Sequence, residues 1–190
     1  MIRLLPALLL LPALTAAANP PPPAVTPAVA RAAAGVREVL EAAFGKVGVM
    51  LDLKEEGDEY MERIAANVRR HGEPKRTVIG VRSVAHAARF RKLLPEARQI
   101  GLVPTLDDIQ PFADAGVPVI RLWPRWLADP TAVARVRAAK CELHVGTGTG
   151  TPAEVVPLLA HRPESLSSDD PARLVRTLKE IAAGAGGVRP

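Results

Sequence analysis

Aromatic residues are scarce in this 190-residue sequence, since its two tryptophans, one tyrosine and three phenylalanines make up 3% of it. Proteins that bind single-stranded nucleic acid stack bases on aromatic side chains that lie among clustered basic residues. Here the lysines and arginines are scattered among aspartates and glutamates, although the net charge is +5. The sequence therefore predicts no nucleic-acid partner. Its basic charge is compatible with phosphate groups or anionic lipid headgroups.

Cysteine and long apolar runs are also scarce. Cys141 is the sole cysteine, which excludes an internal disulfide. A helix needs about 20 consecutive apolar residues to span a bilayer. The apolar run at residues 4–14 is shorter than this and is interrupted by Pro6 and Pro12. We therefore expect no stable transmembrane span.

The N-terminal residues instead have the pattern of an export signal. Residues 1–18 combine Arg3, an apolar run and a stretch of small residues, which is typical of a signal peptide. Residues 19–27 contain five prolines, which favour an extended, semi-rigid linker. We expect export to the periplasm or the cell exterior after cleavage, one folded domain over residues 28–185, and a short tail at residues 186–190.

From Val47 onward, short apolar runs alternate with amphipathic segments, a pattern that is typical of a parallel sheet covered by helices. Most of the apolar runs contain few polar residues, as strands buried on both faces do. The expected strands are Val47–Leu51, Thr77–Val81, Gln99–Val103, Val117–Leu122, Leu143–Gly146 and Ser165–Ser167.

Several helix starts are marked by a short polar side chain followed by proline, as at Asp129-Pro130, Thr151-Pro152 and Asp170-Pro171. Thr151 and Glu154 have the spacing of a capping box. The pattern indicates roughly six strands and seven helices, whereas a closed barrel has eight of each in about 250 residues. The predicted fold is therefore α/β, an incomplete (β/α) TIM-type barrel.

Four stretches resemble, in order and spacing, strands of the glycerophosphodiester phosphodiesterase family. They match a strand that ends in acidic-x-Lys, a strand with a terminal serine, a late strand with its loop, and a final strand with a Thr-Asp-x-Pro signature in which serine here replaces threonine. The resemblance implies the C-terminal portion of that barrel and a phosphoric diester hydrolase of lipid metabolism. The stretches are Gly45–Lys54, Thr77–Ser83, Leu143–Glu154 and Ser165–Pro171.

The resemblance implies that Asp52 is a ligand of a divalent metal, Mg²⁺ or Ca²⁺, and that Lys54 lies beside the phosphate. The chemistry agrees, because hard cations prefer carboxylate oxygens and an ammonium group offsets charge that develops on a phosphoryl oxygen. Both residues lie at the carboxyl end of a strand, where barrel enzymes place their sites. A solvated ion pair at a strand end is the alternative.

Further candidates lie at the ends of later strands. His144 is a candidate for proton transfer if it faces the barrel mouth, and a core or exterior position is the alternative. Arg82 and Arg121 could contact the phosphate of a phosphodiester or phospholipid headgroup, and Trp123 could line the pocket or cover the barrel's end. The loop Gly146–Thr151 could bind an anion through its backbone N–H groups or be a flexible connection.

The residues that supply the acid and base in the family are missing. Its enzymes open with a His-Arg-Gly strand, a Glu-x-Asp element and a second histidine, and none of these precedes the stretch Gly45–Lys54 here. His-Arg occurs only late, at His161-Arg162, where Pro163 follows it. We expect His71 and His86 to be solvated surface groups. Hydrolysis is therefore expected to be impaired, and the alternative is a noncatalytic exported module that binds phosphate-containing ligands. Another chain could also cover the open edges of the sheet, giving an oligomer.

Overall fold

The computed structural model describes residues 27–55 and 57–186. The predicted signal peptide and all of the predicted linker except Pro27 lie outside the described residues. Among the residues that are described, no helix is long and apolar enough to cross a membrane.

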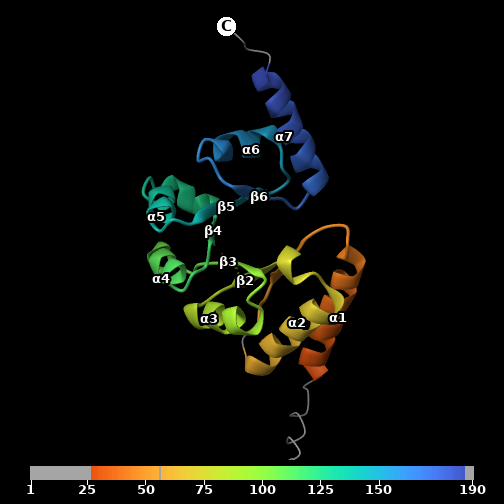
Figure 1. Cartoon of the computed structure of the whole chain (residues 1–190). Coiled ribbons are helices and arrows are strands. Elements are labelled where there is room, and N and C mark those ends of the chain that lie inside the picture. The colour runs from red at the N-terminus through yellow and green to blue at the C-terminus, as the bar shows by residue number, and fades with distance from the viewer. Residues whose placement is uncertain (1–26, 56, 187–190) are drawn as a thin grey trace, which may run out of the picture.

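Six parallel strands form one sheet in which each strand pairs with the next along the chain. The sheet curls into a half-barrel that is open between its first and last strands (Figure 1). The predicted incomplete barrel is confirmed. The strands are β1 (Val49–Asp52), β2 (Thr77–Val81), β3 (Arg98–Gly101), β4 (Val119–Leu122), β5 (Glu142–Gly146) and β6 (Ser165–Ser167).

Several strands begin or end one or two residues away from the predicted positions, and at β1 and β4 the reason is that neighbouring turns take up the backbone N–H groups. Val47 donates its N–H to Ala43 at 3.1 Å, in the turn before β1. Val117 likewise donates to Phe112 at 3.0 Å, and Pro118 has no N–H to give to the sheet. The apolar runs located these two strands correctly, but the turns set their first residues.

Helices follow the strands and cover the outer face of the sheet (Figure 1). Three short 3₁₀ segments, Pro74–Arg76, Leu106–Asp108 and Pro124–Ala128, add to the connections. The helices are α1 (Pro27–Ala43), α2 (Asp58–His71), α3 (Val84–Leu93), α4 (Ile109–Asp114), α5 (Ala132–Ala138), α6 (Pro152–Leu159) and α7 (Pro171–Gly186).

The helix starts predicted at Thr151 and Asp170 are confirmed. Thr151 and Glu154 form the full capping box of α6, and Asp170 accepts a hydrogen bond from the N–H of Arg173 at 2.9 Å. The start predicted at Asp129 was wrong. The carboxylate of Asp129 accepts hydrogen bonds from the N–H and hydroxyl of Thr131, which makes a turn there, and α5 begins only at Ala132.

The two faces of the sheet have different surroundings because side chains alternate along each strand. The main core lies between the helices and the outer face, where the apolar residues of α2 and α3 are buried. At Gly101, an added Cβ would lie 2.8 Å from Cδ1 of Phe112, so the glycine allows α4 to pack close to the sheet. The largest fully buried side chains include Phe90, Phe112, Ile64, Ile79, Ile120 and Leu143.

The opposite, concave face carries the other set of side chains. Ile100, Leu102 and Val119 are buried there, outside the main core cluster. The strand register places Arg121 beside His144, and His144 beside Ser165, on this same face. The concave face therefore has an apolar base formed by residues early in the strands and polar groups toward their carboxyl ends.

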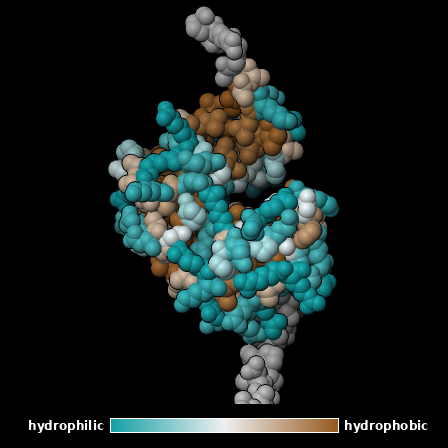
Figure 2. Space-filling model, in the orientation of Figure 1, coloured by the Kyte–Doolittle hydropathy of each residue, from teal (hydrophilic) through white to brown (hydrophobic). Residues whose placement is uncertain are grey.

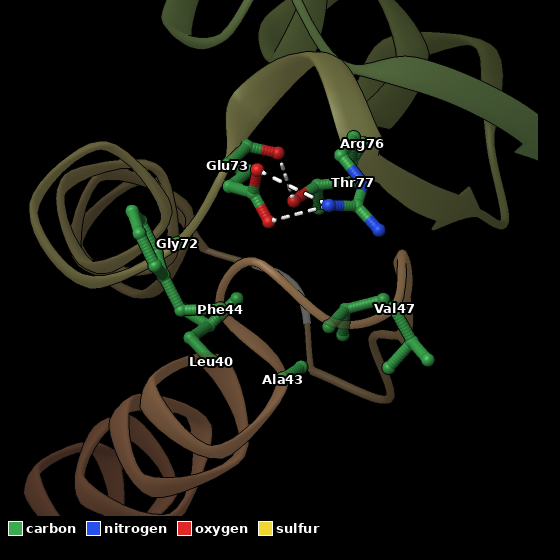
Figure 3. Close-up of a pocket in the computed structure, with 9 residues that line it drawn as sticks. Leu40, Ala43, Phe44, Val47, Gly72, Glu73, Arg76 and Thr77 are labelled. Atoms are coloured by element: carbon green, nitrogen blue, oxygen red, sulfur yellow. Dashed lines mark hydrogen bonds and ion pairs between the residues drawn. The ribbon is translucent and has the colours of Figure 1, made fainter.

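A small cavity lies at the amino end of the sheet, between α1 and the start of β2 (Figure 3). Its volume is about 10 Å³, enough for roughly one water molecule. Glu73 joins the parts around it by accepting hydrogen bonds from Arg76 Nη1 at 3.1 Å and from the N–H of Gly45 at 2.9 Å. This cavity is at the end of the half-barrel away from the polar groups, and its contacts are structural.

Candidate functional site

Charged and polar side chains gather at the carboxyl ends of the strands, on the concave face. Sites of β/α barrels occur at this end because the loops that follow the strands converge there. Figure 2 shows the surface hollowed between the part that contains α7 and the part that contains α1 and α2, where the half-barrel is open. We call this end the mouth, defined by Asp52, Lys54, Arg82, Arg121, Trp123, His144, Ser165 and Ser167.

Asp52 lies at the end of β1 and is paired with two cations. Arg82 Nη2 donates to Asp52 Oδ1 at 2.6 Å, Lys54 Nζ donates to Oδ2, and Arg82 Nε donates to the carbonyl oxygen of Leu53 at 3.1 Å. Partial burial acts to raise the pKa of Asp52, but the hydrogen bonds and charges of Lys54 and Arg82 outweigh it and leave that pKa below its ordinary value. Asp52 is therefore an ionised counter-ion.

This arrangement bears on the metal that the resemblance implies. Both carboxylate oxygens of Asp52 accept hydrogen bonds from cationic side chains. Within residues 27–55 and 57–186, no group of three or more His, Cys, Asp or Glu residues could hold a metal ion. Mg²⁺ and Ca²⁺ take about six to eight oxygen ligands, some of them water. The described residues thus do not form a divalent-metal site by themselves.

Arg121, on β4, is the cation of the mouth that has no carboxylate partner among the described residues. Its guanidinium carbon lies 4.2 Å from the ring centroid of Trp123, and its Nε is buried without a hydrogen-bond partner. Burial lowers the pKa of Arg121 from its ordinary value, while the charges of Asp52 and Asp169 act in the opposite direction and that of Arg82 in the same direction. Arg121 thus lies within electrostatic range of the Asp52 pairings.

His144, on β5, lies on the concave face beside Arg121 and is only 6% exposed. Its Nδ1 is 2.8 Å from Ser165 Oγ, and its Nε2 is 3.1 Å from Ser167 Oγ. Burial, and then the charge of Arg121, lower the pKa of His144 to about 4. The imidazole is therefore neutral at pH 7, and both of its nitrogens are engaged by serine hydroxyls.

Ser165 and Ser167 were not among the site residues predicted from the sequence. The sequence did contain a signal for them, because Ser165-Leu166-Ser167 alternates polar and apolar residues and places both serines on one face of a strand. Their contact with His144 depends on the register between β5 and β6, which the sequence pattern does not specify.

The glycine-rich loop after β5 wraps around a carboxylate of its own chain. The N–H groups of Gly150 and Thr151 donate to Glu154 Oε2 at 2.8 Å and 3.3 Å. These N–H groups therefore already have an anionic acceptor, so the structure gives no support to a phosphate site in this loop. It is the capped entry to α6.

The expectation of a solvated surface position was wrong for His86, whereas His71, at the end of α2, remains partly exposed. His86 is 3% exposed, and its ring centroid lies 5.2 Å from that of Phe90, one helical turn further on. Residues four apart on a helix share a face, and here that face is buried. His71 is partly buried, and its Nδ1 lies 2.8 Å from Glu41 Oε1.

No protein-family model and no curated protein matches this sequence. Solved structures do match the fold. A glycerophosphodiester phosphodiesterase from Agrobacterium tumefaciens superposes with a TM-score of 0.56 at 22% identity, over 73% of this chain and 59% of that one. A glycerophosphoryl diester phosphodiesterase from Parabacteroides distasonis superposes with a TM-score of 0.58 at 19% identity, over 76% of this chain and 54% of that one.

The chain thus spans between 54% and 59% of the length of these two structures. At such low identity the likeness concerns the fold. The resemblance inferred from the sequence motifs is confirmed at that level: this chain has the fold of part of a glycerophosphodiester phosphodiesterase barrel.

Proposed function

We propose that this chain recognises glycerophosphodiesters through the phosphate group, as a phosphodiesterase-type half-barrel domain of lipid metabolism. The observation that carries the proposal is the gathering of Lys54, Arg82 and Arg121 at the mouth, with Asp52 as the carboxylate paired to two of them. A fixed excess of positive charge at a concave, partly buried surface attracts anions. Trp123, held against Arg121, provides an apolar wall for the organic part of the ligand.

Hydrolysis is the further step of this proposal, with Lys54 beside the phosphate and His144 as the candidate group for proton transfer. Cleavage of a phosphodiester needs a proton acceptor for the attacking oxygen and a donor for the leaving one. His144 is buried and neutral, so it cannot act as the donor at pH 7. We therefore expect this chain alone to hydrolyse glycerophosphodiesters slowly at most. The Mg²⁺ or Ca²⁺ that the resemblance implies does not fit the described residues alone, and recognition of phosphate by these side chains does not depend on it.

Binding and turnover can be measured separately on the purified mature protein. Isothermal titration with glycerophosphocholine tests recognition, and glycerol serves as the uncharged control ligand. We expect binding that weakens as salt is raised, because exposed charges are screened. The double variant Arg82→Met/Arg121→Met should abolish it, whereas Arg70→Met removes an exposed arginine on α2 and should not change it. No binding by the wild type, or unchanged binding by the double variant, would refute the proposal.

The noncatalytic exported binding module is the second candidate, and the double serine contact of neutral His144 favours it. Release of glycerol phosphate from glycerophosphocholine, with Mg²⁺, Ca²⁺ or a chelator, separates the two functions. Binding without release would support the module, and metal-dependent release would support the hydrolase. Export is tested by determining the N-terminus and compartment of the protein in cells.

We also infer that the open side of the half-barrel is covered in an oligomer. Met50 on β1 is 40% exposed, and Val175 on α7 is 50% exposed, so apolar groups flank both edges of the opening. Unpaired strand edges of this kind favour association. Light scattering on the purified protein should show more than one copy per particle, and a monomer at all concentrations would exclude self-association.

A further inference from the structure

Two polar atoms of the mouth meet above a glycine. If Gly146, at the end of β5, carried a Cβ, that atom would lie 3.0 Å from Arg121 Nη2 and 3.3 Å from Ser167 Oγ. The guanidinium belongs to β4 and the hydroxyl to β6, and both lie next to the space that a side chain at Gly146 would fill. A guanidinium next to a hydroxyl is a donor set that matches phosphate oxygens.

The three cations of the mouth are not equally available to a ligand. Lys54 already donates to one carboxylate oxygen of Asp52, and Arg82 donates to the other. Arg121 is half-buried, stacks on Trp123 and has no such partner among the described residues. A partly buried cation lacks part of its hydration, so an anion that replaces the missing acceptors binds there with a larger gain than at an exposed charge.

His144 holds Ser167 in place. Each of its ring nitrogens faces a serine hydroxyl, Ser165 at 2.8 Å and Ser167 at 3.1 Å. A neutral imidazole has one donor and one acceptor nitrogen, so both contacts are satisfied in either tautomer. The buried ring cannot turn without breaking them, and this fixes the position of Ser167 Oγ beside Arg121.

Taking these observations together, we propose that the phosphate of the ligand binds at Arg121 and Ser167, over Gly146, with His144 as a positioning residue. Asp52 then acts as the counter-ion that occupies Lys54 and Arg82. This inference rests on the proposed function and gives it a definite location. The ligand class is a phosphate mono- or diester, and the organic group of a diester is directed toward Trp123.

The test is titration of the full mature protein with inorganic phosphate and, separately, with glycerophosphocholine, both in the presence of a chelator. Arg121→Met and Gly146→Ala should each weaken binding of both ligands at least about tenfold. Arg121→Met removes a charge-assisted hydrogen bond, which is worth about that factor or more, and Gly146→Ala fills the space that the phosphate oxygen would occupy. Asp52→Asn should leave affinity unchanged or raise it by up to about tenfold, because it frees two cations. Binding of glycerophosphocholine alone would show that the organic group is required, and equal binding of both would show that phosphate suffices.

The positioning role of His144 has its own readout. His144→Gln keeps a donor and an acceptor for the two serines, so its affinity for both ligands should stay within about threefold of wild type. His144→Leu should lower that affinity as much as Ser167→Ala does. Circular dichroism identifies any variant that fails to fold, and Gly146→Ala and Ser167→Ala then test the same location independently.

The outcomes separate this inference from the proposed function. Absence of binding by the wild type refutes both. Wild-type binding that survives Arg121→Met and Ser167→Ala, but is lost in Asp52→Asn, refutes this inference alone and assigns the ligand to the β1–β2 side of the mouth.

Discussion

Acidification from pH 7 to pH 4 should destabilise the fold through His144. The folded protein holds this histidine neutral because it is buried and lies near Arg121, with a pKa of about 4 against an ordinary value of 6.5. Between these two values the unfolded chain binds a proton at His144 and the folded chain does not. The free energy of unfolding therefore falls as pH decreases through this window, and the full contribution is present above pH 6.5.

The magnitude follows from the width of the window. Each pH unit over which the two states differ by one proton changes the free energy of unfolding by about 1.4 kcal/mol. A window of about 2.5 pH units thus gives a loss of about 3 kcal/mol, which is a large part of the roughly 5–15 kcal/mol that stabilises a typical domain.

Urea unfolding followed by circular dichroism at pH 7.0, 6.0, 5.0 and 4.5 measures this loss. The matched control is His144→Gln, which can hydrogen-bond to both serines but does not titrate. The protein has four histidines, and contributions from the other three are common to the wild type and the variant. We expect the wild type to lose about 2–3 kcal/mol relative to the variant by pH 4.5. Parallel pH curves for the two proteins would show that His144 is not held neutral and would refute the reasoning.

Three further predictions concern the fold and the mouth. Gly101→Ala should lower the free energy of unfolding by about 1–3 kcal/mol in urea titrations, because the new Cβ would lie 2.8 Å from Phe112 Cδ1; a stability equal to wild type would mean that α4 moves away freely. Thr151→Ala should cost about 1 kcal/mol by removing the cap of α6, while Thr151→Ser should cost little; equal losses in both variants would argue against capping. Addition of a chelator should leave the melting temperature unchanged, since the described residues contain no metal-binding group of three or more side chains, and a lower melting temperature would reveal a bound ion.

The sequence alone determined the features that depend on neighbours along the chain. Apolar runs located β1 to β5, and the caps at Thr151 and Asp170 located the starts of α6 and α7. The amphipathic segments between these runs predicted the helices that cover the sheet. These features follow from strand and helix periodicity and from local hydrogen bonds, so a single sequence is enough to read them.

The candidate site was only partly predictable. Asp52, Lys54, Arg82 and Arg121 were expected near the mouth, and the structure places them there. For His144 the sequence left a core or exterior position open, and the structure puts it on the concave face beside Arg121. Their individual roles depend on contacts between separate strands. The sequence could not show that Arg82 would pair with Asp52, 30 residues earlier.

The tertiary structure alone decided how these groups are paired, buried and charged. The register of β5 against β6 places two serines on His144, and the packing around α3 buries His86. A shift of register by one residue would turn each side chain to the opposite face of the sheet. The sequence therefore determined which elements form and which chemical groups they carry. The register and curvature of the sheet decided which groups meet at the mouth, because those distances are set by packing between segments far apart in the chain.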